Sequence, residues 1–193
     1  TPEGVLPSSG AVTTSATDAM ISVPGPAVAV QRSYSSDPSY SSGCATGSGW
    51  SESQFQHVSY NSGTSTMSIH MGARRTATVD LSAGAKVTDP ATGLDFWRVP
   101  GNSTLIVHKA LATYNGTTYA VWRLREPGGA STDYFRQPDA GETSASAVYS
   151  ALVGQIAGVT DTYSGNAHHY AYGIWIGASG TPVAMVEYSA QLM

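Results

Sequence analysis

Hydrophobic and polar residues alternate along much of this 193-residue chain. A period of two places the apolar side chains on one face of a strand, so each alternating run predicts a half-buried strand. In one run, for example, Met67, Ile69 and Met71 share a face. The pattern predicts strands within residues 55–60, 65–71, 75–81, 167–177 and 181–190.

Turn signals separate the strand-like runs. Asn115-Gly116 lies between two of them, within residues 103–126, and Asn-Gly is a strong signal for a tight hairpin. On the returning strand the alternation places Trp122 on the face opposite to Val121. A second turn is expected where Asp89-Pro90 opens and Gly93 closes a break between strands.

One segment has a different period. Between residues 142 and 157, apolar residues recur every three or four positions, which is typical of a helix. Thr143 or Ser144 suits its start, and Gly158 suits its end. The chain therefore predicts a mainly β fold of antiparallel sheets, built from short strands and hairpins, with one helix near 142–157.

The N-terminal residues lack any core-forming pattern. Residues 1–20 are rich in Ser, Thr and Ala, and we expect an extended arm that is ordered only where it pairs with another strand. Residues 21–193 are expected to form a single β-rich domain. Its first strand contains Pro24 and Pro26, which places it at a sheet edge, bulge or strand start.

Composition narrows the class of protein. Only 11% of residues are charged, and the formal net charge is −4. Nucleic-acid binding needs clustered basic residues, and the chain offers only Arg74-Arg75 and the looser pair Arg123 and Arg125. The low charge and the abundance of Ser, Thr and Gly favour a secreted or cell-surface protein. No apolar run is long enough to span a membrane.

No motif in the sequence identifies a catalytic centre, and we expect neither a metal nor a cofactor. The single cysteine, Cys44, excludes an intrachain disulfide. Adjacent residues of a strand face opposite ways, so His168 and His169 are not expected to bind one metal ion together. The remaining histidines and the glutamates lie in separate segments, and we expect most of them at the surface: His57, His70, His108, Glu52, Glu126, Glu142 and Glu187.

Aromatic residues and sequons leave alternatives open. The chain has 11 Tyr among its Ser and Gly residues. These rings would suit stacking on sugars, although packing between strands is the expectation we favour. Asn102 and Asn115 each begin an Asn-x-Ser/Thr sequon, which matters only in a host that glycosylates.

Two stretches resemble the RHS/YD-repeat family. "VPGPAVAVQRSYSS" followed by "GSGWSES" resembles the family's entry segment, and "DTYSGNAHHYAYG" resembles its repeat element, followed by the closing strand "VAMVEYSA". The resemblance implies strands that spiral into a shell, although this chain is far shorter than the family's shells. The matching residues are Pro24, Gly25, Arg32, Tyr34, Ser36, Gly47, Gly49, Trp50, Ser51, Asp161, Gly165, Asn166, Tyr170 and Tyr172.

These observations favour a non-catalytic structural protein of an exported assembly. It would be RHS-shell-like or would self-associate through strand pairing, either with further copies or with the remainder of a larger RHS chain. One alternative is a secreted carbohydrate-binding or glycan-active β-protein. Another is a viral coat or fibre subunit, which shares the low-charge, Ser/Thr/Gly-rich composition.

Overall fold

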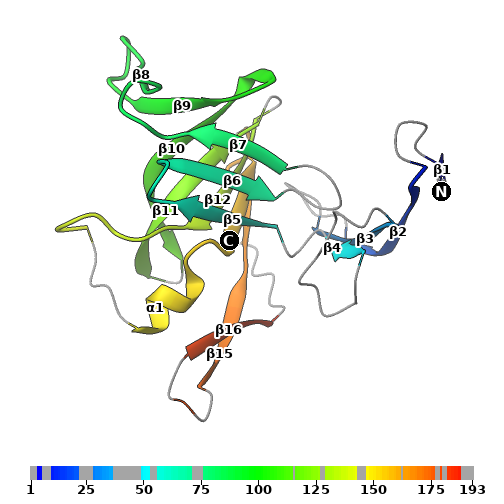
Figure 1. Ribbon diagram of the computed structural model, residues 1–193. Coiled ribbons are helices and arrows are strands. Elements are labelled where there is room, and N and C mark those ends of the chain that lie inside the picture. Colours follow the sequence, from blue (N-terminus) through cyan, green and yellow to red (C-terminus); the bar gives the residue numbers. More distant parts are fainter. Residues whose placement is uncertain are drawn as a thin grey trace.

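A computed structural model shows the arrangement of the chain (Figure 1). Every pair of strands in it is antiparallel, which confirms the predicted mainly β fold. The structure describes residues 4–5, 10–21, 28–36, 49–52, 56–70, 76–114, 116–126, 129–142, 147–161, 163–176, 179 and 182–187.

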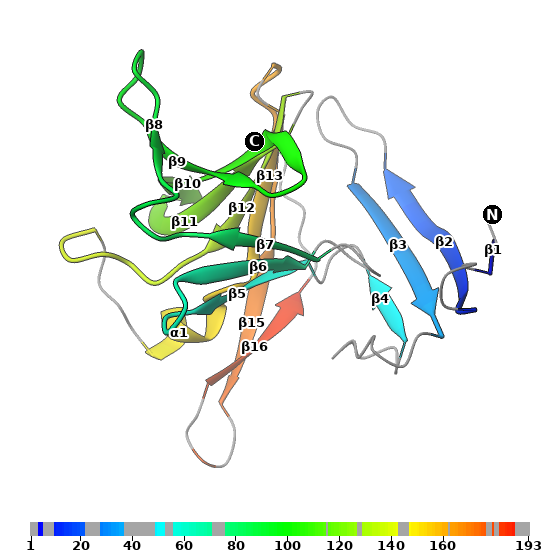
Figure 2. The same cartoon turned by 45° about the horizontal axis from the view of Figure 1, so that its top comes forward.

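An N-terminal sheet of four strands lies to one side of the other sheets (Figure 2). The boundary that the sequence suggests between residues 20 and 21 falls inside its second strand, because residues 12–21 pair with the strand that follows. Pro24 and Pro26 lie outside the described residues. The strands are, in spatial order, β1 (Gly4–Val5), β2 (Val12–Ile21), β3 (Val28–Ser35) and β4 (Trp50–Glu52).

A seven-stranded sheet forms the centre of the molecule. Its longest pair is a hairpin in which Tyr114 lies opposite Thr117, so the hairpin predicted around Asn115-Gly116 is confirmed. In spatial order the strands are β14 (Ala167–His169), β13 (Ile156–Asp161), β12 (Ala130–Phe135), β11 (Thr117–Arg125), β10 (Asn102–Tyr114), β9 (Asp95–Val99) and β8 (Val87–Thr88).

A three-stranded sheet covers one face of the central sheet. It consists of β5 (His57–Asn61), β6 (Thr66–His70) and β7 (Thr76–Asp80). Met67, Ile69 and Val79 are almost fully buried, and they pack with residues of the central sheet into the larger hydrophobic core. The alternation seen in the sequence therefore places one face of these strands in that core. Other core members are Val58, Trp97, Val99, Leu105, Val107, Leu124, Tyr134 and Ile156.

The opposite face of the central sheet has a second, smaller core. Leu152 of a short helix, α1 (Ala147–Leu152), packs there with Val121 and Phe135. The hydroxyl of Tyr149 on α1 donates a hydrogen bond to the carbonyl of Ala120 at 2.8 Å. A hairpin of β15 (Ala171–Ile176) and β16 (Pro182–Glu187) lies next to the helix.

The helix prediction near 142–157 is wrong in its extent. Of that segment the helix occupies only Ala147–Leu152, and residues 143–146 lie outside the described part of the chain. Gly154 has a φ of +91°, which ends the helical path. Ile156 then enters β13 opposite Tyr134, because burial in the central sheet outweighs a weak helical period.

Two turns between strands are built in the same way. In the predicted turn at Asp89, the backbone N–H of Gly93 donates to the Asp89 carbonyl at 2.8 Å, and the Asp89 carboxylate accepts from the N–H of Ala91 at 2.9 Å. Asp161 has equivalent bonds from Gly165 at 2.8 Å and from Tyr163 at 2.9 Å. In both turns an aspartate carboxylate thus accepts a hydrogen bond from the backbone N–H two positions later, which stabilises the turn.

Gly154 joins the three-stranded sheet to the central sheet. Its carbonyl accepts from the N–H of Val58 at 2.7 Å, and its own N–H donates to the Phe135 carbonyl at 2.8 Å. A Cβ at this position would lie 2.4 Å from the Val58 oxygen. Only glycine therefore fits here without displacing β5.

This junction predicts a large effect for Gly154→Ala. The positive φ and the clash with the Val58 carbonyl together should lower the free energy of unfolding by about 3 kcal/mol or more. Gly84→Ala is the matched control, because nothing lies within 4 Å of its added Cβ. Urea unfolding should leave Gly84→Ala within about 0.5 kcal/mol of the wild type. Equal midpoints for the two variants would contradict the role of Gly154.

Candidate functional site

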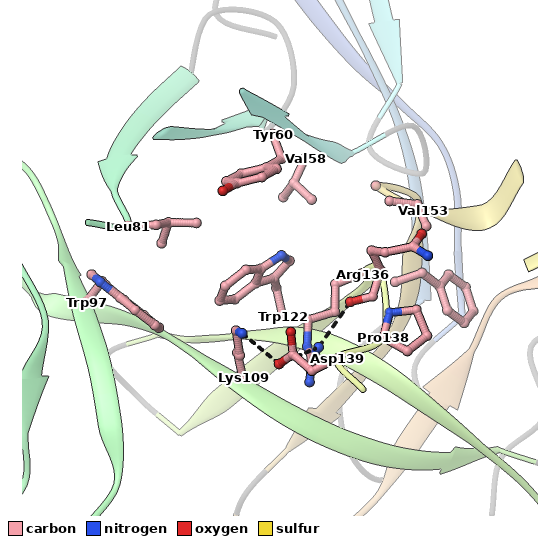
Figure 3. A pocket seen from close by; sticks show the side chains of 13 residues that line it. Val58, Tyr60, Leu81, Trp97, Lys109, Trp122, Arg136, Pro138, Asp139 and Val153 are labelled. Carbon is pink, nitrogen blue, oxygen red and sulfur yellow. Dashed lines mark hydrogen bonds and ion pairs between the residues drawn. The ribbon is translucent and has the colours of Figure 1, made fainter. Parts of the chain in front are cut away.

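A cavity of about 310 Å³ lies between the three-stranded sheet and the central sheet (Figure 3). Val58 and Tyr60 of β5 line it from one side, and Leu81 follows β7. Lys109 and Trp122 line it from the central sheet. The cavity is completed by Trp97, Phe135, the segment 136–139, Val153 and Gly154.

Trp122 is the aromatic centre of this cavity. It packs against the larger core, whereas Val121 belongs to the smaller core, so the two residues face opposite sides of the sheet as the alternation predicts. The Trp122 ring meets Trp97 edge to face, with 5.8 Å between the ring centres. Tyr60 lines the same cavity and is 56% exposed. An incoming ligand would therefore meet an indole and a phenol ring.

Charged groups of opposite sign lie beside the Trp122 ring. Lys109 Nζ is 2.6 Å from a carboxylate oxygen of Asp139 and 5.9 Å from the ring centre of Trp122. The two residues are 30 positions apart in sequence. They meet because β10 is adjacent to β11, and the segment after β12 crosses the same edge of the cavity.

Arg136 stabilises the segment that carries Asp139. Its side chain is only 3% exposed, and its Nε donates to the Val121 carbonyl at 3.2 Å. Its Nη2 lies 2.6 Å from Glu142 Oε1, and the other oxygen of Glu142 accepts from the backbone N–H of Asp139 at 2.7 Å. Hydrogen bonding to Arg136 lowers the pKa of the Glu142 carboxyl. Glu142 and Arg136 thus fix the position of Asp139.

A second hollow, of about 460 Å³, adjoins the cavity. It shares Leu81, Trp97 and Lys109 with the first. On its far side Lys86 Nζ lies 2.6 Å from an oxygen of Asp95, and the hydroxyl of Thr88 donates to the other oxygen at 2.5 Å. Both hollows therefore have a Lys–Asp pair in their walls.

The glutamates considered from sequence do not converge. Among the glutamates whose side chains the structure describes, only Glu142 approaches the cavity, through Arg136. Glu126 is exposed at the end of β11, and the side chains of Glu52 and Glu187 lie outside what the structure describes. Asp139 was missed by the sequence analysis. Pro138-Asp139 is a dipeptide typical of turns, and no neighbouring residue indicates that Asp139 forms an ion pair with Lys109.

The histidines occupy two kinds of position. His57 and His70 stack across β5 and β6 with ring centres 4.3 Å apart. His108, His168 and His169 are buried in the central sheet, contrary to the expected surface position of His108. Nowhere in the described residues do three or more His, Cys, Asp or Glu side chains gather to hold a metal ion. Cys44 lies outside the described residues.

The basic pairs do not form a patch in the described chain. Arg123 is bound internally: its Nε and Nη2 each lie 2.7 Å from a carboxylate oxygen of Asp133. Asp133 is only 2% exposed. Arg74-Arg75 lies outside the described residues. Of the two sequons, Asn102 accepts a hydrogen bond from the Thr104 hydroxyl at 2.8 Å, and Asn115 is outside the described residues.

The N-terminal sheet brings together residues of the RHS-like entry segment. Tyr34 of β3 lies opposite Trp50 of β4, with ring centres 5.2 Å apart. The guanidinium of Arg32 lies 5.5 Å from the Trp50 ring centre and is bound to Asp18 of β2 at 2.5 Å. Three side chains from two separated stretches of the motif thus form one cluster. Pro24, Gly25 and Gly47 lie outside the described residues.

The described residues of the N-terminal sheet form no hydrophobic core of their own. In the described residues it contributes to neither hydrophobic core. Along β2, Val12 and Met20 are 49% and 64% exposed. The short β1 pairs with only Val12 and Thr13, so in the described chain no strand pairs with the outer edge of β2 from Thr14 onward.

No protein-family model matches the chain, and the curated proteins contain no match to it. In the described part of the chain, the helix is far too short to cross a membrane.

The buried histidines predict a loss of stability in mild acid. Burial lowers the pKa of His108, His168 and His169. The unfolded chain therefore binds more protons than the native protein below pH about 6.5. The free energy of unfolding should be highest above that pH and should fall as the pH drops toward the lowered values, by up to about 1.4 kcal/mol per pH unit for each histidine.

His169→Phe tests this prediction at one site. The phenyl ring can keep the contact with Tyr114, whose ring centre is 4.2 Å from that of His169. Urea unfolding at pH 8 and pH 5.5 should show a smaller fall in the free energy of unfolding for the variant than for the wild type. An equal fall in both proteins would mean that His169 does not contribute.

Proposed function

We propose that this chain is a non-catalytic structural module of an exported assembly, and that its N-terminal sheet pairs with the same sheet of a second copy. The observation that carries the proposal is the outer edge of β2, along which no strand of the described chain pairs from Thr14 onward. An unpaired strand edge presents backbone N–H and C=O groups, and such an edge is a template for another strand.

The composition of the edge supports pairing between copies. From Thr14 to Met20 the strand consists of small and β-favouring residues apart from Asp18. The charge of Asp18 is balanced by Arg32 through two hydrogen bonds, at 2.5 Å and 2.6 Å. Two antiparallel copies of β2 would therefore meet without facing unpaired like charges. A bulge between Thr17 and Ala19 limits the pairing to two short segments.

The faces of the N-terminal sheet support the same proposal. A sheet of a few strands is stable only when one of its faces is covered. Among the described residues in and beside this sheet, only Ala11, Ser35 and Gly49 are buried, and the exposed Val12 and Met20 need a partner to leave water. An assembly would supply that cover. An RHS-like wall, in which neighbouring strands continue one another, would supply it in the same way.

A single charge on the β2 edge tests the proposal. Wild-type protein should sediment as a dimer or larger species that dissociates on dilution. Ala16→Lys places a charge on an exposed position of β2, opposes pairing of the edge and should shift the protein to monomer. Leu111→Lys is the control, because Leu111 is 51% exposed but lies on β10, and this variant should associate like the wild type.

Analytical ultracentrifugation and electron microscopy give the result directly. A wild-type protein that remains monomeric at every concentration would contradict pairing between copies. Association that persists in Ala16→Lys and disappears in Leu111→Lys would show that the interface lies on the central sheet and not on β2.

A further inference from the structure

The two hollows beside Trp97 adjoin each other, and together they are called the groove. They share Leu81, Trp97 and Lys109 as a common wall. The backbone N–H of Leu81 donates to the Ser65 carbonyl at 2.8 Å, which ties the segment after β7 to the turn before β6. Volumes of about 310 Å³ and about 460 Å³ are each within the range of small-molecule sites. The walls of the groove are therefore formed by the three-stranded sheet, the segment after β7 and the central sheet, rather than by a single loop.

The rings in the groove suit a ligand with an apolar face. Trp122 is half-buried and Tyr60 is more than half exposed. A pyranose ring has a C–H face that packs on an aromatic ring, and it carries hydroxyls around its rim. Figure 3 shows Trp122 between Tyr60 and the Lys109–Asp139 pair. A sugar ring placed there would contact the aromatic rings with its face and the charged pair with the hydroxyls at its edge.

The charges in the groove favour a neutral, hydroxyl-rich ligand. Lys109 pairs with Asp139, Arg136 with Glu142 and Lys86 with Asp95, so each cation that lines the two hollows lies beside a carboxylate that balances its charge. A hydroxyl both donates and accepts, and it can bridge such a pair. A phosphate would meet a carboxylate at either pair. A quaternary ammonium group would be repelled by Lys109, whose ammonium group already lies beside the Trp122 ring.

The acids do not suit hydrolysis. A glycosidase needs one carboxyl held in its protonated form. Glu142 is instead tied to Arg136, which lowers its pKa, and Asp139 is engaged by Lys109. The groove thus has the features of binding without those of bond cleavage.

We propose that this groove binds a linear, neutral oligosaccharide. One sugar ring lies against Trp122 and Tyr60, and a neighbouring ring lies beside the Lys86–Asp95 pair. This function is independent of strand pairing through β2.

The test uses ligands of two lengths on the whole chain. Cellobiose and cellotetraose have equatorial hydroxyls that leave both ring faces apolar, and maltotetraose and chitotetraose extend the panel. Binding is followed by calorimetry and by tryptophan fluorescence, since Trp122 and Trp97 line the groove. We expect at least one tetrasaccharide to bind about tenfold more tightly than its disaccharide, because it reaches both hollows.

Two variants separate the hollows. Tyr60→Ala should weaken both lengths about tenfold, through loss of the aromatic contact. Lys86→Gln should weaken only the tetrasaccharide. Tyr163→Ala and Arg125→Gln are controls that should bind like the wild type, because Tyr163 is 83% exposed and neither residue lines either hollow.

Three results would overturn the proposal. Failure of every saccharide in the panel to bind would exclude a saccharide site. Equal affinity for both lengths, with no effect of Lys86→Gln, would exclude a two-hollow groove. Equal weakening in Tyr60→Ala and Tyr163→Ala would show that any binding lies outside the groove.

Discussion

The hydrogen bond from Val58 to Gly154 is the constraint on which the larger core depends. It fixes β5 against the end of α1 and the start of β13, and the isolated pairing of His57 with Gln155 continues the contact. Once β5 is held there, Val58, Met67 and Ile69 face the central sheet and are buried. The cavity beside Trp122 begins at this junction, where Val58 and Gly154 line it, and extends to Tyr60 and Leu81.

A buried polar pair fixes the central sheet on its other face. Arg123 and Asp133 are directly opposite each other on β11 and β12. Both carboxylate oxygens of Asp133 are bound by Arg123, and the Tyr114 hydroxyl donates to one of them at 2.7 Å. Removing these partners from a buried carboxylate is costly. A one-residue slip would do so and would exchange the faces of Trp122 and Val121, so the pair disfavours other registers.

Local patterns could predict much of the fold but little of the groove. The alternation at Met67 and Ile69 and the Asn115-Gly116 turn depend on neighbouring residues, and both predictions are confirmed. The helix was overestimated because the three- to four-residue period continues into Ile156, which tertiary pairing turns into a strand. Lys109 and Asp139 meet only through the folding of the intervening hairpin, so no local signal could have indicated the pair.

The two similar turns change what supports the RHS hypothesis. The turn at Asp161 belongs to the late motif, but the turn at Asp89 has the same hydrogen bonds and lies outside any matched stretch. Aspartate and glycine at these spacings are therefore explained by turn chemistry alone. The cluster of Arg32, Tyr34 and Trp50 has no such local explanation, because Trp50 comes from a segment that is well separated in sequence from Arg32 and Tyr34. The RHS hypothesis consequently depends most on the N-terminal sheet, which is also the sheet whose open edge we propose to pair.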